Sequence, residues 1–505
     1  MAKNRQTPIE ISKEAFTKMG YQLIDAIASF IDTIEEKQVT AGASPRQLQT
    51  VVGTASLPEK GTPAAVLLAK ATDLLFHHSL LNGHPKFLGY ITSSAAPLGA
   101  LADMLAAAVN PNVGAQILSP IATEIEKQTV KWLAEFIGVS PDYGGLLVSG
   151  GNMANFTGFL AGRTAKAPKS IKEDGLSIAT TKLVVYCSKA THTWIEKAAV
   201  LFGFGLRSIR WIQTDARNKM DTAILEKTIH EDLEKGATPL MVVGTAGDVS
   251  TGAVDDLNAI AAVCKRYNLW FHVDGAYGIL AAVVPELKPL FAGIEEADSI
   301  ALDPHKWLYS PLEAGCTLVK DPACLIETYS SHPVYYNFEI DGDVKAQNYY
   351  EYGFQNSRGF RALKVWLVLQ QVGRDGYIKM INEDMQLSRL MFDLAKNHPE
   401  LEAVTQSLSI TTLRYVPLEY SGTLTDKEGY LNTLNERLLN EIQQGGAAFL
   451  SNAMVQEKYC LRGCIVNFRT SEKDIREIIE IIVQEGRKVH RQLQEKSEPI
   501  KNSSV

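Results

Sequence analysis

Between residues 93 and 376, short apolar runs alternate with helical patterns, and this alternation restricts the possible folds of the chain more than any other feature. The apolar runs are GLLV, TKLVVYCS, PLMVVGTAG, LWFHVDGAY, DSIALD and GCTLVKD. Stretches with helical spacing of apolar residues, such as TWIEKAAVLFG and DLNAIAAVCKRY, separate them. Nearly unbroken apolar strands that alternate with helices are typical of a mostly parallel sheet covered on both faces. The sequence therefore predicts a large α/β domain over residues 93–376.

Two further regions flank this domain, as expected for a chain of 505 residues. Residues 12–38 and the stretch AAVLLAKATDLLFHH show helical patterns joined by loose links, so residues 1–92 are predicted to be helices that clasp another surface. After residue 376, SITTLRYVP, GAAFLS and CLRGCIVNF indicate strands. One helix is expected to end at Gly445-Gly446, and another to begin with Ser471 and Asp474 in capping-box spacing. Residues 377–505 are thus predicted to form a smaller α+β domain.

Composition excludes several classes of partner. The net charge is −7, with 50 Lys and Arg against 57 Asp and Glu, and no basic block suggests nucleic-acid binding. The six cysteines lack CxxC spacing, which argues against a zinc site and a disulfide framework and favours reduced thiols. The first residues lack the apolar core of a signal peptide, and no apolar run is long enough to cross a bilayer. We therefore expect a cytoplasmic protein that binds no metal, nucleic acid or membrane.

Four polar features stand at the ends of predicted strands, where open α/β sheets bind their ligands. They are the turn 149–152 (Ser-Gly-Gly-Asn), His192, Asp274 and Lys306. Each has an ordinary explanation by itself. The glycines suit any strand-to-helix turn, the histidine could cap a helix, the aspartate could bond loop backbone, and the lysine could extend into solvent.

Taken together, the four features match the requirements of pyridoxal phosphate (PLP). This cofactor needs a phosphate site at a helix N-terminus, a lysine for its aldehyde, a carboxylate for its ring nitrogen and a flat group against its ring. Gly151 with Asn152, His192, Asp274 and Lys306 supply these in chain order. PLP is therefore the predicted cofactor.

Several longer stretches carry a resemblance to a known family. They are HPKFLGYITSS (84–94), SPIATEIEKQTVKWL (119–133), HVDGAYG (272–278), ADSIALDPHKWL (297–308), SRGFRALKVW (357–366) and LRGCIVNFRTSEKDI (461–475). On these stretches the chain resembles the group II PLP-dependent decarboxylases, the aromatic-L-amino-acid decarboxylase family. The resemblance implies the PLP-dependent transferase-like fold (fold type I, that of aspartate aminotransferase). It also implies a homodimer with its active sites at the subunit interface.

The resemblance assigns roles to particular residues. Lys306 would form the internal aldimine, Asp274 would pair with the pyridinium nitrogen, and His192 would stack on the ring. The residues implied to hold the phosphate or to lie near the cofactor are Gly151, Asn152, His305 and Asp248, the last in place of the family's threonine.

The polar, glycine-containing stretch 342–366 is the candidate lid over the site. Counting back from RGFRALKVW, the resemblance places the family's proton-donating loop tyrosine at Tyr349, with Tyr350 adjacent. A tyrosine there favours simple decarboxylation, whereas relatives with phenylalanine make aldehydes oxidatively. The chain departs from the animal enzymes at Gly114 and Gln116, which replace aromatic pocket residues, and at Asp303, which replaces an asparagine near the phosphate.

The leading hypothesis is an enzyme that decarboxylates an aromatic L-amino acid of the Trp, Tyr, Phe or DOPA type to the amine and CO₂. Within the same fold, the alternatives are a decarboxylase of a polar amino acid such as glutamate or diaminobutyrate, and an aromatic aldehyde synthase. From other classes, a catalytically silent dimeric binding protein and a nucleotide-binding α/β protein remain, although no complete nucleotide motif is present.

Overall fold

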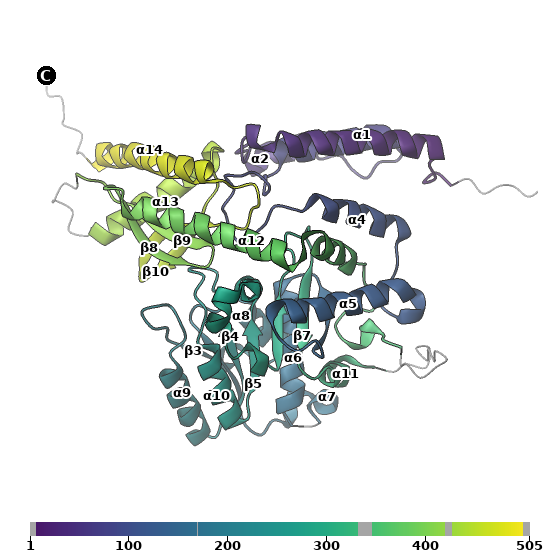
Figure 1. Ribbon diagram of the computed structural model, residues 1–505, viewed down its shortest axis with the longest axis vertical. Coiled ribbons are helices and arrows are strands. Elements are labelled where there is room, and N and C mark those ends of the chain that lie inside the picture. Colours follow the sequence, from purple (N-terminus) through teal and green to yellow (C-terminus); the bar gives the residue numbers. More distant parts are fainter. Residues whose placement is uncertain (1–6, 169, 332–345, 420–426, 498–505) are drawn as a thin grey trace, which may run out of the picture.

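A seven-stranded sheet forms the centre of the computed structural model, which describes residues 7–168, 170–331, 346–419 and 427–497 (Figure 1). The strands lie in the order β1-β7-β6-β5-β4-β2-β3. Only β7 runs antiparallel to its neighbours, β1 and β6, so the predicted mostly parallel sheet is confirmed. The strands are β1 (Gly144–Val148), β2 (Leu183–Ser188), β3 (Ile209–Ile212), β4 (Thr238–Thr245), β5 (Trp270–Asp274), β6 (Ser299–Leu302) and β7 (Gly315–Val319). Strand β3 was not predicted, because this edge strand is short and only partly buried.

Both faces of this sheet are buried, which explains why its strands are apolar without alternation. In β2, Val184 and Tyr186 belong to one hydrophobic cluster, whereas Val185 and Cys187 belong to the other. The first cluster includes residues of α5 (Pro120–Ile137), α9 (Thr222–Glu234), α10 (Leu257–Tyr267) and α12 (Ala362–Lys396). The second includes residues of α6 (Gly151–Lys166), α8 (Trp194–Leu201) and α11 (Ala323–Tyr329). A short helix, α7 (Ile171–Asp174), follows α6.

A second, antiparallel sheet lies in the C-terminal part of the chain. Its order is β10-β11-β9-β8, with β8 (Leu401–Ser407), β9 (Ile410–Tyr415), β10 (Ser451–Val455) and β11 (Lys458–Cys464). Helices α13 (Lys427–Gly445) and α14 (Glu472–Ser497) share a hydrophobic cluster with it. The predicted helix end at Gly445 and the capping box of Ser471 and Asp474 are confirmed. The domain boundary proposed at residue 376 falls inside α12, just after a kink at Gly373, where φ is 67°.

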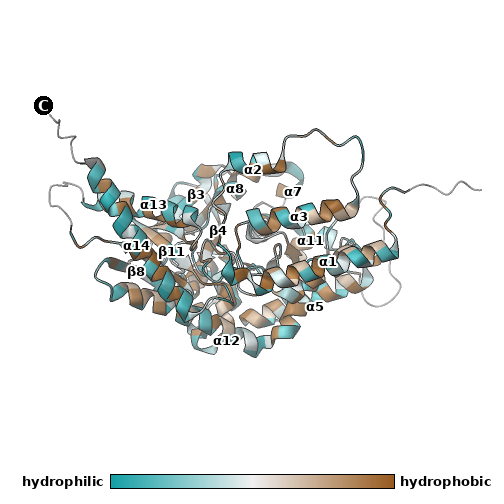
Figure 2. Ribbon diagram, turned by 90° about the horizontal axis from the view of Figure 1, so that it is seen from above, coloured by the Kyte–Doolittle hydropathy of each residue, from teal (hydrophilic) through white to brown (hydrophobic). Residues whose placement is uncertain are grey.

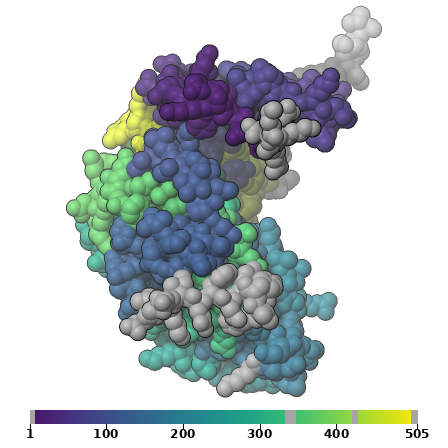
Figure 3. All heavy atoms as spheres, turned by 90° about the vertical axis from the view of Figure 1, so that its right-hand side faces the viewer, coloured from purple at the N-terminus to yellow at the C-terminus, as the bar shows by residue number. Residues whose placement is uncertain are grey.

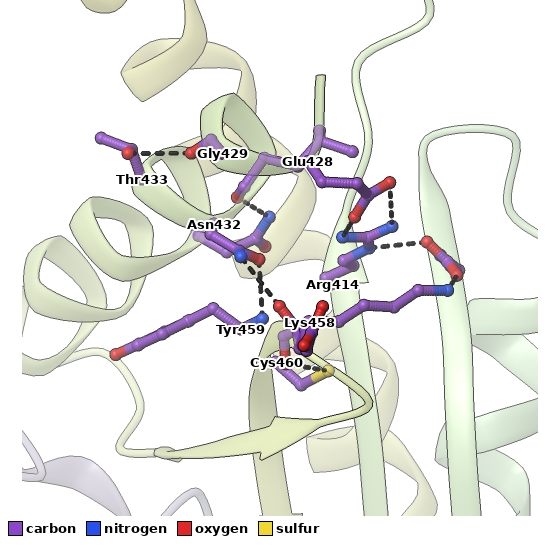
Figure 4. A network of polar contacts seen from close by, with 12 residues as sticks. Arg414, Glu428, Gly429, Asn432, Thr433, Lys458, Tyr459 and Cys460 are labelled. Atoms are coloured by element: carbon purple, nitrogen blue, oxygen red, sulfur yellow. Dashed lines mark hydrogen bonds and ion pairs between the residues drawn. The ribbon is translucent and has the colours of Figure 1, made fainter. Parts of the chain in front are cut away.

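A buried arginine links the elements of this small sheet (Figure 4). Arg414 on β9 donates to Glu402 on β8 at 2.6 Å and to Glu428 on α13 at 2.7 Å. Lys458 on β11 donates to the same Glu402 at 2.6 Å. Because the side chain of Arg414 is only 3% exposed, these carboxylates compensate a charge that burial would otherwise make costly.

The N-terminal helices stand apart from the sheets, at the top of Figures 1 and 3. They are α1 (Lys13–Asp32), α2 (Pro45–Val52) and α3 (Ala64–His78), followed by α4 (Pro97–Val109). Helices α1 and α3 lie side by side, with Phe30 stacked on Phe76 at 4.2 Å between ring centroids (Figure 2). No residue of α1, α2 or α3 is buried, so these helices have no core of their own. Within the described ranges, no helix is both long and apolar enough to cross a membrane.

Candidate active site

The carboxyl ends of the parallel strands surround a cavity of about 490 Å³. The turn after β1, the loops after β2 and β4, the end of β5 and the turn after β6 all contribute to its wall. The structure brings eight of the predicted residues together there: Gly151, Asn152, His192, Asp248, Asp274, His305, Lys306 and the flagged Asp303. The remaining predicted residue, Tyr349, does not line it.

Two glycines open one end of this cavity at the start of α6. Gly150 has a φ of 137°, which L-residues with a side chain rarely adopt. A Cβ atom on Gly151 would lie 2.7 Å from Oδ2 of Asp303, so only glycine fits without displacement. No side chain caps α6, and its first backbone N–H groups are therefore left for a ligand at the positive end of the helix dipole. This turn is suited to an anion such as a phosphate.

Asp274, the last residue of β5, is a buried carboxylate on the cavity wall, 6% exposed. Its Oδ2 accepts a hydrogen bond from the indole Nε1 of Trp194 at 2.7 Å, and its Oδ1 accepts a longer one from Ala276 N at 3.3 Å. Among the ion pairs of the described residues, none involves Asp274. A buried carboxylate without a cationic side chain is costly, so this position suits a ligand that brings a positive charge.

Lys306 follows β6 in a tight turn with Asp303 and His305. Its Nζ lies 3.0 Å from Oδ2 of Asp303, which supplies the opposite charge for this largely buried ammonium. The Oδ1 atom of Asp303 is buried without a hydrogen-bond partner. The sequence offered no reason for an aspartate at position 303. In the structure, Asp303 lies three residues before Lys306 in the same turn and pairs with it.

His305 lies between this turn and the glycines. Burial lowers its pKa, so the neutral ring predominates near neutral pH. Its Nδ1 accepts from Ala314 N at 3.1 Å, and the neutral ring therefore carries its proton on Nε2. This Nε2 lies 3.6 Å from Oδ2 of Asp303, and the ring is close to the glycine turn, since a Cβ on Gly150 would lie 3.2 Å from its Cε1.

His192 and Asp248 occupy other parts of the wall. Burial lowers the pKa of His192, and its Nδ1 accepts from Trp194 N at 3.3 Å. The carboxylate of Asp248 is engaged by its own loop, with Oδ1 accepting from Ser250 N at 2.7 Å and Oδ2 from Ala253 N at 2.9 Å. Asp248 thus shapes the loop after β4, and its oxygens are turned toward that loop.

Tyr349 lies in the hydrophobic cluster on the α6 side of the sheet, away from the cavity. It is 1% exposed, and its hydroxyl has no hydrogen-bond partner. The guanidinium of Arg358 lies 4.6 Å from its ring centroid, and Arg358 is itself paired with the buried Glu126. Tyr350 is also buried. Tyr349 is thus packed in the core of this structure, and its role as proton donor stays a prediction.

The candidate lid 342–366 is only partly described, since residues 342–345 lie outside the described ranges. Its described part is anchored: Gln347 N donates to Oε1 of Gln116 at 2.8 Å, and Gln116 N donates to Oδ1 of Asn348 at 3.2 Å. Gly114 packs against Asn356, whose carbonyl oxygen would lie 2.1 Å from an added Cβ. Neither Gly114 nor Gln116 lines the cavity, so both positions support the segment around Tyr349.

Sequence reasoning did not identify Trp194 as part of the site. The residue was assigned only to a helix, because the helical spacing of TWIEKAAVLFG explains an apolar residue there equally well. Its bond to Asp274 joins residues 80 positions apart, and no local pattern reports such a contact. Tyr90 and Phe156, which also line the cavity, were missed for the same reason.

This set of groups fits PLP. The glycine turn with open N–H groups suits the phosphate, Lys306 suits the aldehyde, and the unpaired Asp274 suits a protonated ring nitrogen. A cavity of about 490 Å³ is within the size range of cofactor sites. Across the described residues, no group of three or more His, Cys, Asp or Glu side chains could hold a metal ion.

Comparisons with known proteins agree with this chemistry. The family model described as the pyridoxal-dependent decarboxylase conserved domain matches residues 45–414. An aromatic-L-amino-acid decarboxylase of Bacillus atrophaeus is 33% identical over 93% of this chain and 95% of its own length. A phenylacetaldehyde synthase of a Rosa hybrid cultivar is 28% identical over 94% of both chains. The solved structure of Oryza sativa TDC with PLP and tryptamine aligns with a TM-score of 0.88 at 25% identity, covering 96% of this chain and 99% of that one.

Proposed function

The chain belongs to the pyridoxal-dependent decarboxylase family, and from this membership we propose that it converts an aromatic L-amino acid into its amine and CO₂. The observation that carries the proposal is the meeting of Lys306, Asp274 and the Gly150-Gly151 turn in one cavity. Similarity to the aromatic-L-amino-acid decarboxylase of Bacillus atrophaeus over nearly the whole chain favours the aromatic substrate class.

The phosphate of PLP would be held at the start of α6. The open N–H groups of Gly151 and Asn152 are donors there, and the Nε2–H of His305, whose nitrogen lies 3.6 Å from Oδ2 of Asp303, is a third donor beside them. Because these donors are fixed by a helix terminus and a buried ring, an anion would bind without reorganising the site.

Lys306 and Asp274 would hold the reactive end of the cofactor. Lys306 offers its amine to the aldehyde, and Asp303, 3.0 Å from Nζ, keeps this side chain in place. Asp274 would keep a proton on the ring nitrogen, since it is buried and has no basic partner among the described residues. Bound PLP supplies the electron sink that accepts the electron pair released when the bond to the carboxyl carbon breaks.

His192 contributes a flat, neutral ring to the cavity wall. Its lowered pKa keeps it uncharged near neutral pH, so it can lie against an aromatic ring without repelling a cation. Asp248 holds the shape of the loop after β4 through its bonds to Ser250 and Ala253. We assign Asp248 an indirect role in cofactor binding for this reason.

The reaction consumes one proton: the amino acid loses CO₂, and a hydrogen replaces the carboxylate on Cα. A second candidate function is oxidative, because the Rosa hybrid phenylacetaldehyde synthase matches 94% of the chain. In that reaction the amino acid, O₂ and water yield the aldehyde, CO₂, ammonia and hydrogen peroxide.

The decisive experiment incubates the PLP-loaded protein with tryptophan, tyrosine, phenylalanine, DOPA, glutamate and 2,4-diaminobutyrate. Mass spectrometry of the products and an oxygen electrode separate the candidates. Amine and CO₂ from an aromatic substrate, without oxygen uptake, support the proposal. Aldehyde with stoichiometric peroxide supports the second candidate, and turnover of only the polar amino acids refutes the aromatic assignment.

Two variants test the assigned residues. Lys306→Ala should abolish both turnover and the visible absorbance of bound PLP, and Asp274→Ala should reduce turnover far more than PLP content. Lys320→Ala is the control, because this lysine follows β7, contacts Glu295 and Glu296 and does not line the cavity. Normal turnover in Asp274→Ala would refute the role of this carboxylate.

We infer a homodimer that forms through the N-terminal helices. Support comes from the absence of buried residues in α1, α2 and α3 and from the row of exposed apolar side chains on α4. Leu105→Glu, at a position 56% exposed on α4, should yield monomers in sedimentation analysis. Leu233→Glu on α9, 45% exposed, is the matched control and should leave the dimer intact. A dimer in both variants would place the interface elsewhere.

A cytoplasmic location is also part of the proposal. All six cysteines are free, and five of them are buried, which suits a reducing compartment. Fractionation of the native cells, followed by immunodetection, tests this location directly.

A further inference from the structure

Trp194 is the only described side chain that donates a hydrogen bond to Asp274. It is the first residue of α8 and has no exposed surface. Its indole Nε1 donates to Oδ2 of Asp274 at 2.7 Å, whereas Oδ1 of the same carboxylate receives only the 3.3 Å bond from the backbone of Ala276. Oδ2 is therefore engaged by the indole, whereas Oδ1 accepts only one long hydrogen bond.

Aromatic neighbours fix the orientation of this indole. Phe159 contacts it edge-on with ring centroids 6.3 Å apart and an interplanar angle of 82°, and His272 does so at 5.6 Å and 76°. Phe156 lies against it at 6.5 Å. A buried indole N–H needs an acceptor, and these neighbours leave Trp194 directed at Asp274. The carboxylate is thereby held in one plane.

His272, two residues before Asp274 on the same strand, does not perform this task. Its Nδ1 and Nε2 are engaged by Ser299 at 2.8 Å and Asn155 at 2.7 Å. Burial lowers its pKa to about 4, so it carries no positive charge near neutral pH. Of the described side chains, the indole of Trp194 is therefore the one that orients the carboxylate of Asp274.

Building on the proposed function, we propose that Trp194 is a positioning residue that holds the carboxylate of Asp274 in place and aims its Oδ1 at the ring nitrogen of the cofactor. A hydrogen bond donated to a carboxylate stabilises its charged form. A proton shared between this carboxylate and a ring nitrogen therefore stays on the nitrogen. Without the indole N–H, the proton shifts toward Asp274.

The chain offers a matched control in Trp270. This tryptophan is also buried, lies in the same hydrophobic cluster and donates its Nε1 to Oγ of Ser299 at 2.8 Å, without a bond to Asp274. Trp194→Phe and Trp270→Phe each remove one indole and one hydrogen bond, and only the first affects Asp274.

The test measures the binding of PLP to the apoprotein and the chemical shift of the ring nitrogen of isotope-labelled PLP in the bound state. A hydrogen bond to a charged group changes an equilibrium about 10- to 100-fold. Trp194→Phe should weaken PLP binding by at least about tenfold and move the nitrogen shift toward the unprotonated value, with Trp270→Phe within about twofold of wild type. Adding Trp194→Phe to the Asp274→Ala variant should change neither PLP binding nor the nitrogen shift further.

Equal effects of Trp194→Phe and Trp270→Phe would overturn the inference, as would an effect of Trp194→Phe that persists beside Asp274→Ala. If Trp194→Phe does not fold, replacement of Trp194 by benzothienylalanine keeps the ring shape and removes only the N–H, with the same expected outcome. Failure of wild-type protein to bind PLP would refute the proposed function itself, which is a separate result from any difference between the two tryptophans.

Discussion

Asp384 supports the turn that carries Lys306 by accepting hydrogen bonds from Trp307 and Tyr309. The ionisation of this buried carboxyl leads to a quantitative prediction about stability. Asp384 lies on α12 and is 3% exposed. Its Oδ2 accepts hydrogen bonds from the indole of Trp307 at 2.7 Å and from the hydroxyl of Tyr309. Burial raises the pKa of Asp384 to about 7, and the two hydrogen bonds offset only part of that effect.

The sign of the pH dependence follows from this raised pKa. An aspartate in an unfolded chain has a pKa of about 3.9, so the folded state binds the proton more tightly. The resulting stability is fully present below the unfolded pKa and is lost as the pH rises through about 7. Between about pH 5 and about pH 8, the ionisation of Asp384 should lower the free energy of unfolding by about 3 kcal/mol.

The variant Asp384→Asn isolates this contribution, because the amide oxygen can still accept from Trp307 and Tyr309 but does not titrate. Urea unfolding, followed by tryptophan fluorescence at several pH values, measures the stability difference between wild type and variant. This difference should change by about 3 kcal/mol in favour of the variant from about pH 5 to about pH 8. Asp393→Asn, at an exposed position on the same helix, is the control and should leave the wild-type profile unchanged. A difference that does not vary with pH would refute the reasoning.

Three further substitutions probe the site and its support. Gly151→Ala places a Cβ 2.7 Å from Oδ2 of Asp303 and should weaken PLP binding at least about tenfold in a fluorescence titration. Unchanged binding would contradict the role of the turn. Glu126→Gln leaves the buried Arg358 without its counter-charge and should cost about 3–5 kcal/mol in urea unfolding, whereas a cost below about 1 kcal/mol would mean that the pair is screened. Tyr349→Phe removes a buried hydroxyl that has no partner, so stability and the amine product should both be retained. A switch to aldehyde would instead support this tyrosine as the proton donor.

Local patterns were sufficient for six of the seven strands of the central sheet. Apolar runs such as LVVYCS and WFHVD became β2 and β5, because strands buried on both faces must be apolar throughout. The turn residues were equally informative, since Ser471 bonds to Asp474 three positions away and α13 ends at Gly445, just before Gly446 with its φ of 74°. Because open α/β sheets bind ligands at the carboxyl ends of their strands, the glycine turn, His192, Asp274 and Lys306 were expected to lie together, and the structure brings them to one cavity.

What the sequence determined by itself was the set of groups that can hold PLP, because each stands at the end of a strand that the local pattern of apolar residues predicts. Only the tertiary structure decided how the side chains of those groups are oriented, hydrogen-bonded and buried. The bond from Trp194 to Asp274, the brace of Asp384 on the lysine turn and the burial of Tyr349 beside Arg358 all join residues from separate elements. Such contacts depend on how helices pack across a sheet, and packing is set by the shapes and charges of distant side chains, which leave no regular trace along the chain.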